Sequence, residues 1–275
     1  MKRLFAALLI GLFSVTLCWS QEAPKKPETP PPAPSTEPLA TLDQILEKLI
    51  EGSGGKAALE KLTSRQVKGT FEIPSMGASG TFESYAKAPN KAYTVIEVPG
   101  FGQIRQSYDG VVAWEDNPMV GMRDLAGTEL AARKRDADFY GALHMKDLYP
   151  QMTVKGKEKV GERSAWLVEA APAEGKPEKM YFDTETGQVI RQDAERESPQ
   201  GAALSQTYFE DFRDVDGVKM PFTIRQVMPM FELMLMLKFT EVKHNIEIDD
   251  AKFVKPAPAA PTPAPAPAAP KPPAK

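Results

Sequence analysis

The side chains that most often carry enzyme chemistry are scarce in this chain of 275 residues. It has two histidines, His144 and His244, and one cysteine, Cys18. Neither histidine has the HxH or HExxH spacing that would place two imidazoles on one metal ion, and no GxSxG, P-loop or GxGxxG motif is present. We therefore expect a protein with no catalytic residue, no metal site and no cofactor.

One acidic turn has two interpretations. Asp214-x-Asp216-Gly217 resembles part of a calcium loop, but the position two before Asp214 holds Phe212 and no glutamate stands at the end of the loop. Asp and Gly tolerate the positive φ of a tight hairpin, so the pattern predicts a turn between two strands. A hydrolase on the same scaffold stays an alternative, although no carboxylate pair stands out from the other surface charges.

The chemistry that the sequence favours is apolar contact. Two-residue periodicity predicts three successive strands, Ser205–Arg213, Met220–Val227 and Phe231–Lys243. In the third strand, one face carries Phe231, Leu233, Leu235, Leu237 and Phe239, and the other carries Met234, Met236, Lys238, Thr240 and Val242. Because half of this strand is apolar on both faces, one face must pack on the body of the protein. The other needs a second apolar cover, from protein or from a ligand.

Methionine is concentrated in the last two of these strands and at the start of an insertion, Met119–Met145. The methionines in question are Met119, Met122, Met220, Met228, Met230, Met234 and Met236. A flexible, polarisable side chain suits a surface that accepts varied apolar partners. The alternative is that these side chains fill irregular gaps between a sheet and its helices.

The elements that would position this strand begin with a helix. Thr41-Leu42-Asp43-Gln44 has the pattern of a capping box, apolar residues follow at helical spacing, and Gly52 ends the run. A short helix over Lys56–Leu62 is expected next. Later in the chain, Met119–Met145 has a helical pattern and is too long for a hairpin loop, so we expect it to pack as a lid.

An antiparallel meander is predicted on both sides of this insertion, because short turns such as Asp109-Gly110 join the strands. The further predicted strands are Arg65–Ile73, Gly80–Lys87, Lys91–Val98, Gly102–Tyr108, Val111–Glu115, Met152–Val160, Ser164–Ala170, Glu178–Phe182 and Gln188–Ala194. A sheet of about 11–12 strands twists and cannot stay flat. The expected fold is mainly β (α+β): a strongly curved antiparallel sheet or incomplete β-barrel with an N-terminal helix and a helical lid.

The two ends of the chain differ in composition from its middle. Residues 1–20 combine Lys2 and Arg3 with an apolar run, which predicts a signal peptide cleaved near Ser20. Lipidation at Cys18 is the alternative, although Leu17 replaces the small residue that a lipobox has before its cysteine. Residues 21–38 and 256–275 are rich in proline and alanine and are expected to be extended, disordered tethers. The predicted domain is 39–255.

Charge limits the class of partner. The formal net charge is −3, and removing Lys2 and Arg3 with the signal peptide brings it to −5. This balance, without a basic cluster in the predicted domain, argues against nucleic acid as a partner. The chain is expected to be a monomer in the periplasm or cell envelope.

Three segments carry a resemblance to a known family. They are Tyr108–Glu115 (YDGVVAWE), Tyr181–Val189 (YFDTETGQV) and Tyr208–Phe222, which ends in DGVKMPF. Together with the order of elements over Leu39–Lys255, they resemble the LolA and LolB periplasmic carriers, the outer-membrane lipoprotein-sorting proteins. The resemblance implies an incomplete barrel with a helical lid and a cavity for acyl chains. It also implies a strand arginine that holds the lid closed. Arg65 and Arg105 lie on predicted strands, and neither is assigned that role.

The leading hypothesis is a non-enzymatic carrier that binds lipid or lipoprotein acyl chains in the envelope. The apolar candidates for its cavity are Val67, Phe71, Tyr93, Val95, Trp114, Met122, Leu130, Phe139, Trp166, Val168, Met234 and Met236. A slip of one residue in register would reverse the face of each strand residue. The alternative is an envelope interaction or sensor module whose sheet is a platform for another protein.

Overall fold

A computed structural model describes residues 40–196 and 201–257. The chain divides into two units, Met1–Pro38 and Leu39–Lys275, and all described residues belong to the second. The predicted signal peptide (1–20) and linker (21–38) lie outside the described residues, as does most of the predicted tail. Within the described residues, no helix is both long enough and apolar enough to span a membrane.

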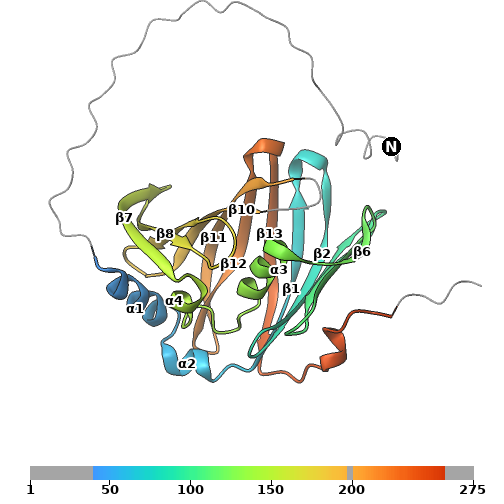
Figure 1. The fold of residues 1–275 in the computed structure, drawn as a ribbon, viewed down its shortest axis with the longest axis horizontal. Coiled ribbons are helices and arrows are strands. Elements are labelled where there is room, and N and C mark those ends of the chain that lie inside the picture. Colours follow the sequence, from blue (N-terminus) through green and yellow to red (C-terminus); the bar gives the residue numbers. More distant parts are fainter. Residues whose placement is uncertain (1–39, 197–200, 258–275) are drawn as a thin grey trace, which may run out of the picture. The chain divides into compact units, whose positions relative to one another are not determined.

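The second unit is built on one antiparallel sheet of thirteen strands (Figure 1). The strands are β1 (Ser64–Ile73), β2 (Ala78–Lys87), β3 (Lys91–Val98), β4 (Gly102–Tyr108), β5 (Ala113–Asn117), β6 (Gly121–Asp124), β7 (Gln151–Val160), β8 (Arg163–Ala171), β9 (Glu178–Asp183), β10 (Val189–Arg196), β11 (Ala203–Val215), β12 (Val218–Met228) and β13 (Leu233–His244). Their order is β6-β5-β4-β3-β2-β1-β13-β12-β11-β10-β9-β8-β7, so β1 joins β13 and the sheet does not close. The predicted curved, incomplete barrel is confirmed.

The insertion differs from the prediction at its start. Residues Gly121–Asp124, predicted as helical, form strand β6, which pairs with β5 through Glu115↔Arg123. A four-residue edge strand has too little periodicity of its own and is defined by its partner. The helical part is therefore shorter and consists of α3 (Gly127–Asp136) and α4 (Met145–Leu148), which lie within the curve of the sheet (Figure 1).

The N-terminal helix α1 (Leu42–Gly52) packs on the concave face of the second half of the sheet, at strands β8 and β9. Helix α1 begins at Thr41, whose capping box with Gln44 is confirmed. Its apolar stripe packs with α4 on strands β8 and β9 in a core of Ile45, Leu46, Leu49, Met145, Tyr149, Val168, Ala170, Met180 and Phe182. At Gly54 (φ +115°) a Cβ would lie 2.1 Å from the carbonyl oxygen of Gly217, so only glycine permits this approach to the β11–β12 turn. Helix α2 (Lys56–Glu60) follows.

A second core identifies the concave face of the first half of the sheet. Residues around α2 and Phe139 pack on Val67, Phe82, Leu237, Phe239 and Val242. Strict alternation would put Val242 opposite Phe239. A β-bulge interrupts the β1–β13 register between Lys68 and Gly69, where Glu241 and Phe239 are the partners. The extra residue returns Val242 to the concave face.

The convex face of β2–β5 is covered by the C-terminal segment, which includes the 3-10 helix η3 (Asp250–Lys252). The carbonyl oxygen of Phe253 accepts hydrogen bonds from Ser107 Oγ (2.7 Å) and Trp114 Nε1 (3.2 Å). Lys87 donates to the carbonyl oxygen of Ile248 over 2.9 Å. The Phe253 side chain is fully buried, so this strap forms part of the fold.

We predict that Phe253→Ala lowers the free energy of unfolding by about 3 kcal/mol, because it leaves a cavity beneath the strap. Urea unfolding followed by circular dichroism measures this difference. The adjacent Val254, which is 53% exposed, supplies the control: Val254→Ala should change the free energy by less than about 0.5 kcal/mol. Equal effects of the two substitutions would show that the strap does not stabilise the domain.

Candidate functional site

The apolar surface that the helices leave partly open lies on β13. Leu233, Leu235 and Leu237, which we call the leucine strip, alternate onto the concave face, since Leu237 belongs to the core beneath α2 and Phe139. Across the β12–β13 pair, Ile224 lies opposite Leu237, and Phe209 of β11 lies opposite Ile224. All of these side chains are half-buried. The concave face therefore presents continuous apolar surface that the protein itself covers only in part.

An apolar pocket of about 310 Å³ lies between α1, α4 and strands β9–β12. Leu49, Leu148, Met180, Val189 and Phe209 supply apolar wall, and Tyr149, Gln192 and Asp136 supply polar groups. Phe209 faces Ile224, the neighbour of the leucine strip. The pocket and the strip are thus two parts of one apolar surface.

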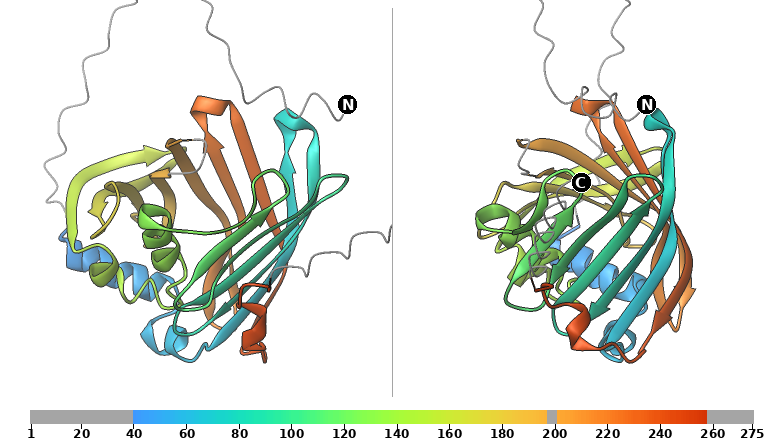
Figure 2. Two further views of the ribbon diagram at one scale, coloured as in Figure 1. Left: turned by 45° about the vertical axis from the view of Figure 1, so that its right-hand side comes forward. Right: turned by 90° about the vertical axis from the view of Figure 1, so that its right-hand side faces the viewer.

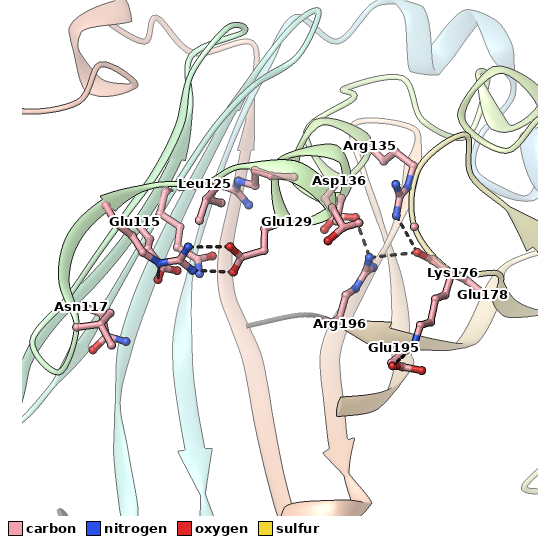
Figure 3. Close-up of a pocket in the computed structure, with 17 residues that line it drawn as sticks. Glu115, Asn117, Leu125, Glu129, Arg135, Asp136, Lys176, Glu178, Glu195 and Arg196 are labelled. Atoms are coloured by element: carbon pink, nitrogen blue, oxygen red, sulfur yellow. Dashed lines mark hydrogen bonds and ion pairs between the residues drawn. The ribbon is translucent and has the colours of Figure 1, made fainter. Parts of the chain in front are cut away.

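A second, polar pocket of about 300 Å³ lies where α3 crosses between the two halves of the sheet (Figure 3). Its wall includes Arg123 and Glu129 on one side and Glu178 and Arg196 on the other. Asp136, at the end of α3, lines both pockets. Burial raises the pKa of this carboxyl, and Arg196 opposes the shift. The polar and apolar pockets therefore meet at one titratable group.

The wall between the pockets is a hydrogen-bonded cluster around Glu178, whose side chain is 2% exposed. Its carboxylate accepts from Arg135 Nη2 (3.0 Å), Arg196 Nη1 (3.1 Å), Tyr149 Oη (3.0 Å) and Gln192 Nε2 (2.5 Å). Burial, followed by the charge of Glu178, raises the pKa of the Tyr149 hydroxyl, which keeps it a donor. Arg135 belongs to α3, so this cluster holds the helix to β9 and β10.

The other end of α3 is tied to the opposite side of the sheet. Arg123 of β6 donates from Nε to Glu115 of β5 over 2.7 Å, and from Nη1 and Nη2 to Glu129 of α3 over 2.7 Å each. These hydrogen bonds, together with the charges of the two carboxylates, raise the pKa of Arg123. Figure 3 shows both sets of contacts around the same helix. Helix α3 is therefore fastened at both ends, by Glu129 near its start and by Arg135 near its end.

Two nitrogen-containing side chains, Arg65 and His244, lie at the floor of the concavity. The guanidinium carbon of Arg65 is 5.7 Å from the centre of the Phe139 ring, and Arg65 is paired in register with His244. Burial lowers the pKa of both groups. His244 Nδ1 lies 3.0 Å from Asp216 Oδ2, and its Nε2 has no hydrogen-bond partner within the described part of the chain. A strand arginine thus contacts the helical insertion, whereas Arg105 pairs with Asp116 on the convex face.

The predicted cavity residues divide between the two faces. The concave face or its helices carry Val67, Phe71, Leu130, Phe139, Trp166 and Val168. Val67, Phe71 and Val168 are buried in the core, and Leu130 packs α3 onto Tyr108 and Ala113. None of these six residues lines the apolar pocket.

The other predicted cavity residues lie on the convex face. Tyr93 and Val95 alternate away from Ile96, which packs on the core beneath α2, and Trp114 lies under the strap. Met122 pairs with Asp116, and Met234 and Met236 point opposite to the leucine strip. Period-two alternation separates the leucine and methionine faces of β13, but it does not tell which of them meets the helices. The packing of Leu237 with α2 and Phe139 assigns the leucine face to the concave side.

The described residues contain no group of three or more His, Cys, Asp or Glu side chains that could hold a metal ion. Their two histidines each contact an aspartate instead, His144 with Asp138 and His244 with Asp216. What the arrangement offers chemically is apolar surface beside a polar, charge-balanced pocket.

Comparison with known proteins places the fold. The sequence matches no protein-family model and no curated protein. A DUF1329 family protein from Desulfovibrio piger has a TM-score of 0.54 at 14% identity, over 78% of this chain and 97% of its own. A LolA superfamily protein from Nitrosomonas europaea has a TM-score of 0.54 at 13% identity, over 76% and 97%. The resemblance to the LolA superfamily is confirmed as a likeness of fold.

A third solved structure agrees with the other two. It is a domain from Vibrio parahaemolyticus that is named for outer membrane lipoprotein sorting, with a TM-score of 0.53 at 12% identity over 76% of this chain and 95% of its own. Identities this low extend the likeness to the fold and not to individual residues.

We predict that Glu178→Gln loosens α3, because a neutral amide cannot match the charges of Arg135 and Arg196 that now converge on Glu178. Hydrogen exchange measured by mass spectrometry should become at least about 10-fold faster in peptides covering 127–136, which corresponds to about 1.4 kcal/mol. Glu195→Gln is the control, since Glu195 pairs with exposed Lys176. Unchanged exchange in the Glu178 variant would mean that the cluster does not hold the helix.

A pH effect follows from His244. Because burial lowers its pKa below the ordinary value of 6.5, the folded protein binds fewer protons here than the unfolded chain as the pH falls through 6.5. This group therefore lowers stability on the acid side of that value. We expect His244→Gln to lose less stability than the wild type between pH 7.5 and 5.5 in urea unfolding. Equal losses in the two proteins would contradict this assignment.

Proposed function

We propose that this protein is a non-catalytic binding protein of the cell envelope that holds the acyl chains of a lipid or lipoprotein on its concave face. The observation that carries the proposal is the leucine strip, which remains half-exposed on the side of the sheet where the helices lie. A fully packed interior would have covered Leu233 and Leu235 with helix side chains. Uncovered apolar surface in a concavity is the usual mark of a ligand site.

The neighbouring pockets indicate how an amphiphile would be oriented. The apolar pocket of about 310 Å³ and the polar pocket of about 300 Å³ meet at Asp136. An acyl chain would occupy the apolar pocket and extend along the leucine strip. Its polar head would lie toward the arginines and carboxylates beneath α3. Among the basic side chains that line the polar pocket, Arg133 forms no ion pair with a carboxylate of the described residues.

The likeness of fold supports this proposal at a coarser level. Proteins with this fold include a LolA superfamily member and a domain named for outer membrane lipoprotein sorting. Secretion, which the sequence of residues 1–20 predicts, would agree with a binding role in the cell envelope. In general terms the protein would bind lipid acyl chains, and more specifically it would carry lipoproteins.

A matched pair of double variants tests the site. Leu233→Glu/Leu235→Glu should weaken binding of a fluorescent C16 fatty acid by at least about 10-fold, because a carboxylate in an apolar contact costs more than about 1.4 kcal/mol. Met234→Glu/Met236→Glu makes the same chemical change on the convex face of the same strand. We expect this second variant to bind as the wild type does in fluorescence titration.

Two results would count against the proposal. Equal loss of binding in both variants, with both folded by circular dichroism, would remove the concave face from consideration. A wild-type protein that binds no fatty acid, and carries no lipid when purified without detergent and examined by native mass spectrometry, would reject acyl-chain binding altogether.

A further inference from the structure

Four hairpins that turn at the same end of the sheet share one sequence pattern. The tips are Pro74-Ser-Met76, Pro99-Gly-Phe101, Pro118-Met119-Val120 and Pro229-Met230-Phe231. In each, a proline is followed within two residues by a large apolar side chain. They join β1 to β2, β3 to β4, β5 to β6 and β12 to β13, and antiparallel order places these four turns at one end. We call them the apolar rim.

Five large side chains of the rim are exposed, and Phe101 is half-buried. The exposed fractions are 69% for Met230, 50% for Phe231, 53% for Met119, 43% for Met76 and 41% for Val120. Two of the tips are 3-10 turns, η1 (Pro74–Met76) and η2 (Pro229–Phe231), and each ends in a left-handed residue, Gly77 and Glu232. These compact turns hold the apolar residues beyond the ends of the strands, where the core cannot cover them.

The tips are grouped in space as well as in sequence. Because β1 pairs with β13, tips η1 and η2 project side by side, as Figure 2 shows for the cyan and orange hairpins. Pro118 lies beside Gly102 at the foot of the neighbouring tip, where a Cβ on the glycine would be 3.3 Å from the proline ring. Two pairs of apolar tips therefore stand at one end of the concavity.

The charge at the rim indicates the nature of its partner. Glu232 is the one charged residue in tips 74–77, 99–101, 118–120 and 229–232. No basic side chain belongs to them, so attraction to acidic lipid or nucleic acid does not account for the pattern. Of the apolar tip residues, Val120 lines the polar pocket beneath α3, whereas Met76, Met230 and Phe231 line neither of the two pockets described above. A neutral lipid surface can accept several separate apolar tips at once.

We propose that the apolar rim docks this protein on the surface of a lipid bilayer, with Met76, Met230 and Phe231 entering the interface. Phe231 ends η2, two residues before Leu233, the first residue of the leucine strip, so apolar residues continue from the rim to the concave face. Docking would thus place the open end of that face against the membrane. This inference concerns the rim and does not require that the concave face bind an acyl chain.

Flotation with neutral phosphatidylcholine–phosphatidylethanolamine vesicles tests the rim in the purified full chain. The triple variant Met76→Ser/Met230→Ser/Phe231→Ser should bind at least about 10-fold more weakly than the wild type, because it removes three exposed apolar side chains. Its matched control is Val111→Ser/Val112→Ser, which alters exposed apolar residues, 77% and 40%, in the β4–β5 turn at the opposite end of the sheet. This control should float as the wild type does.

Two further readouts establish the manner of binding. Wild-type flotation should be nearly the same at 0.05 M and 0.5 M salt, since apolar contacts are not screened. A Phe231→Trp variant should show a blue-shifted emission and be quenched by brominated lipid, after subtraction of the wild-type signal. Because these residues are exposed, the variants should keep wild-type circular dichroism and fatty-acid affinity, which separates this test from that of the proposed function.

Three outcomes would overturn the proposal: a wild-type protein that does not float, a triple variant that floats as well as the wild type, or binding that salt abolishes. A protein partner for the rim would be indicated if the wild type failed to bind vesicles, and the membrane assignment would then be withdrawn.

Discussion

Strands β6 and β7 are the two edges of the sheet, and neither has a further strand to satisfy its outer backbone groups. Proteins cover or shorten such edges, because an open edge can pair with other chains. Here the segment that joins these two strands is the helical insertion. Connecting one edge to the other carries α3 and α4 across the open side of the curve. The placement of the helices is thus a consequence of the strand order, and the concavity exists because the sheet stays open.

How α3 is held explains which surface stays uncovered. Its apolar side chain Leu130 packs on Tyr108 and Ala113, toward the β4–β5 side, and its last turn is fixed by the buried carboxylate of Glu178. A buried carboxylate is tolerated only when several donors surround it, and four donors do so here. Helix α3 therefore contacts the two flanks of the sheet, β4–β5 on one side and β9–β10 on the other. The middle strands β12 and β13 keep a half-exposed apolar face between them.

The two faces of the sheet differ in how far the chain covers them. On the convex face of β2–β5, the strap that contains Phe253 covers Trp114 and brings Lys252 within 4.0 Å of the Tyr85 ring centre. On the concave face, apolar surface extends from the leucine strip to the tips that contain Met230 and Phe231. The chain itself therefore covers the convex face of β2–β5, whereas the concave face of β12 and β13 remains apolar and partly open.

Local patterns in the sequence were sufficient for most of the elements. The capping box at Thr41 and the strands Lys91–Val98 and Gly102–Tyr108 follow from hydrogen bonding and periodicity within a few residues, so they were predicted with correct bounds. Strand β6 was missed, because four residues at an edge are defined by the strand beside them. The curvature of the sheet was also predictable, since twist follows from strand number.

Tertiary structure alone decided which face of each strand meets the helices. Along β13, leucine and methionine alternate with similar hydrophobicity, so periodicity could not assign the inner face, and Met234 and Met236 were placed in the cavity. The β-bulge beside Phe239 places Val242 on the concave face. The sequence around Phe239 contains no pattern that predicts this bulge. The Glu178 cluster joins residues from α3, β9 and β10, which lie up to 61 positions apart between Arg135 and Arg196. Its members meet only because strand pairing brings them together.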